Sequence, residues 1–339
     1  MGYGLSSKML VNLVEGCAQA RTVVPGQVLW TLDGDRTVHT VISEVTAAKA
    51  REAVEVVTDR MTFVASPDLL LATPGGWTQA REAAGATVAW TPARKLCRER
   101  LRIRPGYDFG YFVGATCADG TVGRNYVSLV VNEEWFASRY AAALTACTGL
   151  PARLEPVSRP SGYLERDAPG FRVRVVSSYL ADALRHYVGG DAHHMRQCFP
   201  RVVLRDIETF RGFLDGYVDG DGCPIRHWPG RVVTSANVPF LTELAQIIGA
   251  RFTPSTKVPA SQLCVSDRWE SRGTFVPEFH RTDPPESSWV AVRDVRPRPA
   301  AGTKPFTFYS YRLAPYPTFL VNGHLVREPR SPDRPGPVR

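Results

Sequence analysis

The stretch "GFLDGYVDGDG" at residues 212–222 has the apolar spacing of a helix, yet it carries glycines inside the run. Each glycine in a helix interior costs about 1 kcal/mol relative to alanine. The stretch then ends on Asp219 and Asp221, although a carboxylate at a helix C-terminus opposes the helix dipole. Because such a helix is unfavourable by itself, we expect its glycines to serve a close contact and its aspartates to serve a ligand.

A second copy of this pattern, "YFVGATCADG", occurs at residues 111–120. Both copies have a glycine about one helical turn or more before the end, Gly114 in the first and Gly216 in the second. Small residues at this spacing allow two helix backbones to approach closely. The repeat therefore predicts a pair of packed helices that deliver Asp119 and Asp221 to the same end of the pair.

Two carboxylates near one helix axis need a neutralising partner, and a hard divalent cation such as Mg²⁺ or Mn²⁺ prefers carboxylate oxygens. Such ions promote in-line attack on a phosphodiester. The glycines that follow, Gly120 and Gly222, suit a left-handed helix end and a close approach of backbone to ligand. An ordinary amphipathic helix with an Asp-Gly turn explains one copy better, but two copies with similar following elements favour the paired site.

Residue composition and apolar periodicity divide the rest of the chain into a β-rich segment, an α+β segment and a second β-rich segment. Residues 20–100 consist of short Val-, Ile- and Thr-rich runs separated by turns, and β texture returns from Trp289. Helical periodicity appears between these segments, with strand-like runs after it. The expected helices cover residues 107–120, 133–149, 178–190, 206–220 and 238–250.

Composition limits the classes of protein. The chain has 339 residues, a formal charge of +8 and a pI of about 9.2, which suits a polyanionic partner. Its seven cysteines form no CxxC pair, which argues against a disulfide framework and a zinc knuckle. No run approaches the roughly 20 apolar residues of a membrane span, and the start lacks signal-peptide character. We therefore expect the cytoplasm of a bacterial or phage-infected cell and no membrane partner.

The duplicated segment resembles the LAGLIDADG homing endonucleases in their single-chain form with two motifs, over about 180 residues. By this resemblance, the penultimate residue of each motif, Asp119 and Asp221, binds the catalytic Mg²⁺ or Mn²⁺. The first motif departs from the family pattern, because Cys117 stands where the family often has an aspartate that Asp219 supplies in the second motif. The resemblance also implies a monomer, since the internal duplication replaces a dimer.

The resemblance further implies that each half places a curved sheet in the DNA major groove, on a long asymmetric target. Arginine can then pair with guanine, and Asn or Gln with adenine. The family often adds one basic catalytic residue per half, for which Lys257 is the candidate in the second half. The DNA-binding candidates, expected on alternating strand positions, are Arg124, Asn125, Arg172, Arg174, Arg226, His227 and Arg231.

The flanking β segments resemble the split halves of an intein, or Hint, domain, through "PGQVLWTLDG", "TFVASPDLLLATPGGWTQA" and "FYSYRLAPYPTFLVNGHLVRE". The residues of splicing are replaced. The position of the first nucleophile falls near Val23, and the activating Thr-x-x-His reads Ser66 to Leu69. The terminal His-Asn reads Arg327 and Glu328, followed by proline. We therefore expect that protein splicing is lost.

The expected fold class is α+β, with two pseudo-twofold-related αββαββα units flanked by a split, mostly-β Hint-like domain. The expected function is a site-specific, Mg²⁺-dependent double-strand DNA endonuclease of an intein-derived mobile element. The alternatives are a non-cleaving DNA-binding protein on the same fold, acting as a repressor or RNA-splicing cofactor, and an active self-splicing intein. The expected segments are an extension (1–22), Hint-like parts (23–103 and 288–328), the endonuclease (104–287, halves at 104–200 and 201–287) and a disordered tail (329–339).

Overall fold

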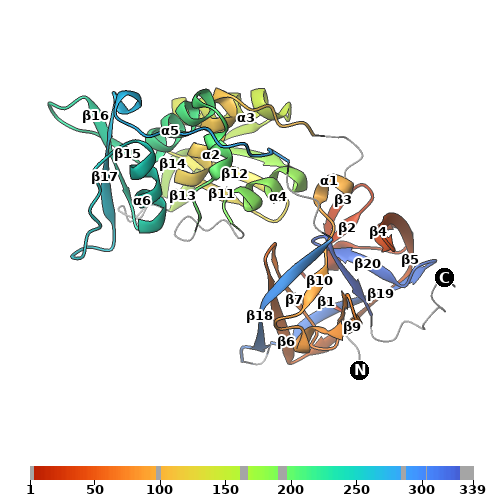
Figure 1. Cartoon of the computed structure of the whole chain (residues 1–339). Helices are drawn as coiled ribbons and strands as arrows, with labels where there is room; N and C mark the ends of the chain where they lie inside the picture. The colour runs from red at the N-terminus through yellow and green to blue at the C-terminus, as the bar shows by residue number, and fades with distance from the viewer. Residues whose placement is uncertain are drawn as a thin grey trace. The chain divides into compact units, whose positions relative to one another are not determined.

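The chain forms two compact units in a computed structural model (Figure 1). Unit 1 comprises residues 1–100 and 285–339, and unit 2 comprises residues 101–284. The tail expected at 329–339 lies outside the described residues. Within the described part of the chain, no helix is long and apolar enough to cross a membrane. The structure describes residues 4–96, 101–160, 167–189, 197–283, 288–302 and 304–328.

Unit 1 is built mainly of strands, as its Val-, Ile- and Thr-rich runs predict. The short helical elements are η1 (Ala20–Thr22), η2 (Ala80–Glu82) and α1 (Ala93–Leu96). The strands are β1 (Leu5–Ser6), β2 (Leu10–Leu13), β3 (Gly16–Gln19), β4 (Val28–Asp33), β5 (Arg36–Ala50), β6 (Glu52–Thr58), β7 (Thr62–Ala65), β8 (Leu70–Thr73), β9 (Gly76–Gln79), β10 (Thr87–Ala89), β18 (Trp289–Pro299), β19 (Phe306–Ala314), β20 (Thr318–Val321) and β21 (His324–Arg327).

The two β-rich segments of the sequence form one sheet system. Its order is β10-β18-β6-β7-β1-β19-β5-β4-β2-β20-β21-β8-β9, and β3 pairs with β2. Strands from the two ends of the chain therefore lie next to each other in the sheet, with Leu5 opposite Tyr309 and Val11 opposite Val321. Residues 4–22, expected to be part of an extension, instead contribute β1–β3 and η1, because Leu5 and Val11 are fully buried in the core.

Unit 1 also contains a repeat that the sequence analysis missed. The hairpin β2–β3 leads into η1, and the hairpin β8–β9 leads into η2. Equivalent backbone bonds close both turns: Ala20 N–H donates to the Met9 carbonyl at 2.8 Å, and Ala80 N–H donates to the Leu69 carbonyl at 2.7 Å. The signal in the sequence is the tripeptide Gln-Ala-Arg, which begins at Gln19 and again at Gln79.

The first half of unit 2 has the expected αββαββα order. Its sheet order is β11-β12-β14-β13, and helices α3 and α4 contact its strands. The elements, in chain order, are α2 (Tyr107–Asp119), β11 (Gly120–Val122), β12 (Tyr126–Val131), α3 (Glu134–Thr148), β13 (Arg153–Pro160), β14 (Asp167–Val176) and α4 (Ser178–Tyr187).

The second half is shorter than the αββαββα unit predicted. It has the sheet β15-β16-β17, with no counterpart of β13 or α4 among its described residues. The segment 251–260 contains Pro254 and Pro259, and proline lacks the N–H that a central strand donates. The elements are η3 (Arg201–Arg205), α5 (Ile207–Asp221), β15 (Gly222–Pro224), β16 (Gly230–Ser235), α6 (Val238–Ile247), β17 (Ser261–Ser266) and η4 (Trp269–Ser271).

A segment without helix or strand, residues 272–283, follows η4 where the first half has α4. The N–H of Glu278 donates to the Leu204 carbonyl at 2.9 Å, which ties the segment to η3. Farther along, Asp283 accepts a hydrogen bond from the Tyr179 hydroxyl of α4. The segment thus connects the two halves of unit 2.

Each of the five helices predicted from apolar periodicity is present within three residues of its expected bounds. The central helix α2 is buried continuously from Phe109 to Cys117, because α5, α3 and the strands β11 and β12 surround it. Figure 1 shows α2 and α5 side by side at the centre of unit 2. These two helices position the candidate site.

Candidate active site at the ends of two helices

Four glycines hold α2 and α5 at backbone contact. A Cβ on Gly114 would stand 2.0 Å from the Phe213 carbonyl oxygen, and one on Gly216 would stand 2.3 Å from the Tyr111 carbonyl oxygen. Real Cβ atoms essentially never come within 3.0 Å of another heavy atom. Gly114 and Gly216, predicted as interface residues, therefore lie in the interface. The pattern extends one turn further back, to Gly110 and Gly212, which the sequence analysis did not single out.

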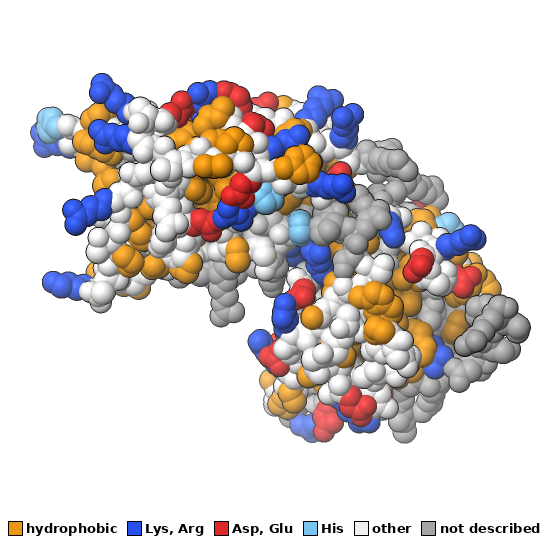
Figure 2. All heavy atoms as spheres, viewed as in Figure 1, with side chains coloured by type: hydrophobic (Ala, Val, Ile, Leu, Met, Phe, Trp, Pro, Cys, Tyr) orange, Lys and Arg blue, Asp and Glu red, His pale blue; other side chains and the backbone are white. Residues whose placement is uncertain are grey.

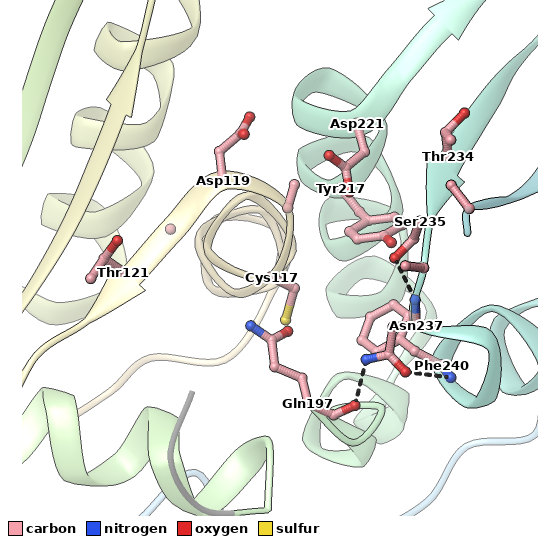
Figure 3. A pocket seen from close by; sticks show the side chains of 14 residues that line it. Cys117, Asp119, Thr121, Gln197, Tyr217, Asp221, Thr234, Ser235, Asn237 and Phe240 are labelled. Atoms are coloured by element: carbon pink, nitrogen blue, oxygen red, sulfur yellow. Dashed lines mark hydrogen bonds between the residues drawn. The ribbon is translucent and has the colours of Figure 1, made fainter. Parts of the chain in front are cut away.

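Asp119 and Asp221 are the last residues of these helices, and both line one cavity of about 410 Å³. In Figure 3 the two carboxylates stand at the adjoining ends of α2 and α5. Asp119 is exposed, whereas Asp221 is partly buried. The repeat predicted this convergence, and the close helix packing produces it.

Burial and, to a smaller extent, the nearby charge of Asp119 raise the pKa of the Asp221 carboxyl to about 7, while a hydrogen bond from Tyr217 opposes the shift. Two carboxylates that share one site raise the pKa of one of them in this way. No lysine, arginine or histidine is among the described residues that line the cavity. The two acids therefore form a site that favours either a proton or a cation from solution.

The donor set fits a hard divalent ion. Among the described residues, no group of three or more His, Cys, Asp or Glu could hold a metal. Any cation at Asp119 and Asp221 would thus take its other ligands from hydroxyls, backbone carbonyls, water or a bound phosphate. Mg²⁺ commonly binds through one or two carboxylates together with water and substrate phosphate oxygens.

Gly120 and Gly222 differ from the left-handed helix ends that we predicted. Both have extended backbones, with φ of −77° and −90°, because the chain passes directly from each helix into β11 or β15. Glycine is needed there for space. A Cβ on Gly120 would lie 2.6 Å from the Thr116 carbonyl oxygen, and one on Gly222 would lie 2.2 Å from that of Val218. Gly120 lines the cavity directly, next to Asp119.

The predicted basic residue, Lys257, lies outside the group of residues that line the cavity. It is exposed in the segment between α6 and β17, where its N–H donates to Ser255 Oγ at 3.4 Å. Figure 2 shows basic side chains around the end of unit 2 formed by the β15–β17 sheet. The structure therefore does not bring Lys257 together with Asp119 and Asp221.

Several polar residues of the cavity were missed by the sequence analysis. Tyr217, one turn before Asp221 on α5, is hydrogen-bonded to both Asp221 and Ser235. Asn237 Nδ2 donates to the Gln197 carbonyl at 2.8 Å, and Figure 3 shows the Gln197 side chain beside Cys117. The spacing of Tyr217 and Asp221 on one helix face was the only local signal. Gln197 and Asn237 reach the cavity through tertiary packing.

Asp219 has a different environment from Asp221. Arg139 of α3 donates to Asp219 Oδ2 at 2.8 Å and to the Tyr107 hydroxyl at 2.7 Å, and its guanidinium lies 4.4 Å from the centre of the Tyr111 ring. The Tyr111 hydroxyl also donates to Asp219 at 2.8 Å. Asp219 is thus neutralised within the protein and ties α5 to α2 and α3, while its counterpart Cys117 is buried at the cavity.

The DNA-binding candidates fall into two groups. Arg172 and Arg174 alternate with buried Val173 and Val175 on β14, so they share the outer face of the first sheet. Arg231 differs from the prediction, because it alternates with Val232 and so lies on the face of the buried residue Val233. The remaining candidates lie in turns rather than on strands: Arg124 and Asn125 between β11 and β12, and Arg226 and His227 between β15 and β16.

In unit 1, the residues predicted for the splicing blocks meet at Gly4. Ser66 N–H donates to the Gly4 carbonyl at 3.0 Å, and a Cβ on Gly4 would stand 2.6 Å from Glu328 Oε1. Burial raises the pKa of the Glu328 carboxyl to about 8. Val23, where we placed the first nucleophile, instead caps η1 in the hydrophobic core. Gly4, rather than Val23, therefore lies beside Ser66 and Glu328 in the structure.

Leu69 and His324 are both fully buried in unit 1. Leu69 stands at the position of the activating histidine. A histidine is present nearby in the fold, since His324 Nε2 lies 2.9 Å from Thr58 Oγ1 and its Nδ1 lies 3.2 Å from the Val321 carbonyl oxygen. Burial lowers the pKa of His324 to about 4, which makes it a neutral structural residue at physiological pH.

Comparisons with known proteins give partial matches. No family model matches the chain. The DNA-directed RNA polymerase subunit Rpo1C of Methanocaldococcus jannaschii is 29% identical over 120 residues, which is 35% of this chain, and the chain spans 13% of that subunit.

Solved structures match about a quarter of this chain. A DnaB intein from Synechocystis sp. PCC 6803 is 14% identical, with a TM-score of 0.25, over 26% of this chain and 68% of that one. The gp41-1 intein is 16% identical, with a TM-score of 0.23, over 27% and 70%. An intein-like domain from Clostridium thermocellum is 8% identical, with a TM-score of 0.25, over 27% and 68%, and a DnaB mini-intein mutant is matched over 62% of its length.

Proposed function

We propose that unit 2 is a site-specific double-strand DNA endonuclease of the LAGLIDADG type. The observation that carries the proposal is the pair Asp119 and Asp221, which two glycine-packed helices bring to one cavity that no described basic residue lines. Such a pair of carboxylates suits a divalent cation, and divalent cations are a standard means of hydrolysing phosphodiesters.

The roles of the residues follow from their positions. Asp119 and Asp221 would hold Mg²⁺ or Mn²⁺, which supplies charge stabilisation at the phosphate and a more acidic bound water. Tyr217 supports the ionised form of Asp221 by hydrogen bonding to it. The backbone contacts at Gly114 and Gly216 keep the helices at one fixed separation, which favours a preorganised pair of carboxylates.

The proposed substrate is duplex DNA with a long asymmetric target, bound by a monomer in the cytoplasm. The two sheets of unit 2 supply two recognition surfaces that differ in length, with four strands in the first and three in the second. Arg172 and Arg174 on the outer face of the first sheet offer the guanidinium groups that pair with guanine. For Arg124 and Arg226, which lie in turns, we propose contacts to phosphates rather than to bases.

We further propose that unit 1 is a Hint-like scaffold that no longer splices. Splicing needs a nucleophilic side chain at the first junction and a cyclising amide at the second. In the structure, glycine stands beside the terminal acid: Gly4 meets Glu328, and a side chain on Gly4 would also collide with the Tyr309 carbonyl. A thiol or hydroxyl at this position therefore has no room beside the present backbone.

The proposed activity is tested by cleavage of a randomised plasmid library with Mg²⁺ by the full chain and by its Asp119→Asn/Asp221→Asn variant. Cuts at a long recurring sequence that the variant does not make would support the endonuclease. Salt-resistant retention of one sequence without cuts would favour the non-cleaving DNA-binding alternative. That alternative has one structural argument, the absence of Lys257 from the described residues that line the cavity. The absence of both cuts and retention would contradict the proposal.

A further inference from the structure

Building on the proposed function, we infer that the two sheets of unit 2 recognise half-sites of different base composition. The first sheet selects a half-site that contains guanine, and the second sheet selects a half-site of A·T pairs. The outer faces of the two sheets differ in charge at equivalent positions of the strand register.

Equivalent rows of side chains can be identified because each sheet begins at the glycine that ends a motif helix. One residue after Gly120, Thr121 pairs with Ser128, which pairs with Arg174. One residue after Gly222, Cys223 pairs with Val232, which pairs with Cys264. Arg174 of the first sheet therefore corresponds to Cys264 of the second.

The next outer row shows the same difference. In the first sheet Val130 pairs with Arg172, and Arg172 pairs with Glu155. In the second sheet Thr234 pairs with Gln262. Arg172 therefore corresponds to Gln262, so both arginines of β14 are replaced by uncharged residues on β17.

These rows lie on the face opposite the core of each sheet. On β14, Val173 and Val175 are buried and Arg174 between them is exposed. On β17, Leu263 and Val265 are buried and Cys264 between them is exposed. Figure 1 shows the strands β15, β16 and β17 as one sheet at the end of unit 2 away from α3 and α4.

The side chains of the first sheet suit guanine. The Arg174 guanidinium lies 4.1 Å from the centre of the Tyr126 ring, which restricts its orientation. Glu155 accepts hydrogen bonds from Arg172 Nε at 2.7 Å and from Arg172 Nη2, which hold the second guanidinium in place and leave its Nη1 group for a base. An arginine with a fixed fork can donate two hydrogen bonds to guanine O6 and N7, and its positive charge complements DNA.

The side chains of the second sheet suit A·T pairs. Gln262 is exposed and can form the paired hydrogen bonds that a carboxamide makes with adenine N6 and N7. Val232 offers an apolar contact for the methyl group of thymine. Cys223, Thr234 and Cys264 on the same rows are exposed and uncharged, so the described residues of these two rows provide no guanidinium for guanine.

The test is selection of bound sequences from a randomised duplex library by the full chain in EDTA, followed by sequencing. We expect one motif with guanine at fixed positions in one half and A·T pairs in the other. Arg174→Cys should erase one guanine preference, and Cys264→Arg should create a guanine preference at the mirrored position of the other half. Each change in base discrimination should be on the order of tenfold to a hundredfold.

Arg293→Cys, an exposed change in unit 1, is the matched control and should leave the motif unaltered. Thermal unfolding of each variant shows whether it is folded. Guanine in both halves, or swapped residues that move no base preference, would overturn the inference while leaving the proposed DNA binding intact. Failure of the wild-type chain to enrich any sequence would instead contradict the proposed function itself.

Discussion

The replacement Gly114→Ala tests whether backbone contact between α2 and α5 sets the site. A Cβ on Gly114 would lie 2.0 Å from the Phe213 carbonyl oxygen and 2.9 Å from the Tyr217 N atom, whereas ordinary contact begins at 3.4 Å. Both obstacles are backbone atoms, so a change of rotamer cannot relieve the overlap. The helices must therefore separate by roughly 1 Å or more at this turn.

The expected loss of stability is the difference between two effects. Overpacking of a core costs about 1–3 kcal/mol, and rigid obstacles place this case near the upper end. Alanine recovers about 1 kcal/mol of helix propensity relative to glycine. The net destabilisation should be about 2 kcal/mol, which for a unit of this size lowers its midpoint of thermal unfolding by about 4–8 °C.

Calorimetry of the full chain measures this effect, and DNA cleavage measures its consequence for Asp119 and Asp221. Gly75→Ala is the control, since a Cβ there would have no heavy atom within 4 Å, and it should alter stability by less than about 1 kcal/mol. An unchanged or higher unfolding midpoint for Gly114→Ala, with full cleavage, would refute the argument that close helix contact builds the site.

Three further predictions concern charge. The pKa of Asp221 is raised to about 7, so folded unit 2 binds more protons than the unfolded chain between about pH 4 and 7. The free energy of unfolding of unit 2 without divalent cation should therefore fall as the pH rises through this range. Asp221→Asn should flatten the dependence of unfolding free energy on pH, and in urea titrations at pH 8 it should stabilise unit 2 by on the order of 1–3 kcal/mol. The same variant should abolish cleavage. An unchanged pH dependence would contradict the raised pKa of Asp221. Glu328 should have the same effect on unit 1, because its raised pKa of about 8 lowers the free energy of unfolding as the pH rises from about 4 to 8. Glu328→Gln should remove that loss in urea titrations. Arg139→Gln should destabilise unit 2 by about 1 kcal/mol, since Arg139 is partly exposed but pairs with Asp219 and the Tyr111 ring; urea unfolding that matches wild type would show that this network is not stabilising.

The helices of unit 2 could be predicted because their signals are local. Apolar periodicity set their bounds, and the repeated glycine-aspartate pattern located Gly114, Gly216, Asp119 and Asp221. The error about Gly120 arose because glycine is common at left-handed helix ends, whereas here the adjoining strand keeps the backbone extended. Glycine is required by the space beside the last helical turn, which a sequence does not show.

Tertiary contacts explain the other differences. Gly4 could not be recognised from its neighbours, because the Tyr309 carbonyl and Glu328 that require a glycine come from the other end of the chain. Gln197 and Asn237 enter the cavity from separate segments. Arg226 and His227 were expected on a strand, but the Pro-Ile-Arg-His-Trp-Pro run forms the turn between β15 and β16. Turn length sets strand register, and proline at both ends limits the strands there.

The most direct test of the carboxylate site is Mn²⁺ binding followed by electron paramagnetic resonance at pH 8. We predict that the wild-type chain removes Mn²⁺ from the free-ion signal and that Asp119→Asn/Asp221→Asn does not. Binding by the wild type should weaken as the pH falls below about 7, because a proton then competes for Asp221. Equal Mn²⁺ binding by the double variant, or no binding by the wild type, would contradict the assignment of Asp119 and Asp221 as a divalent-cation site.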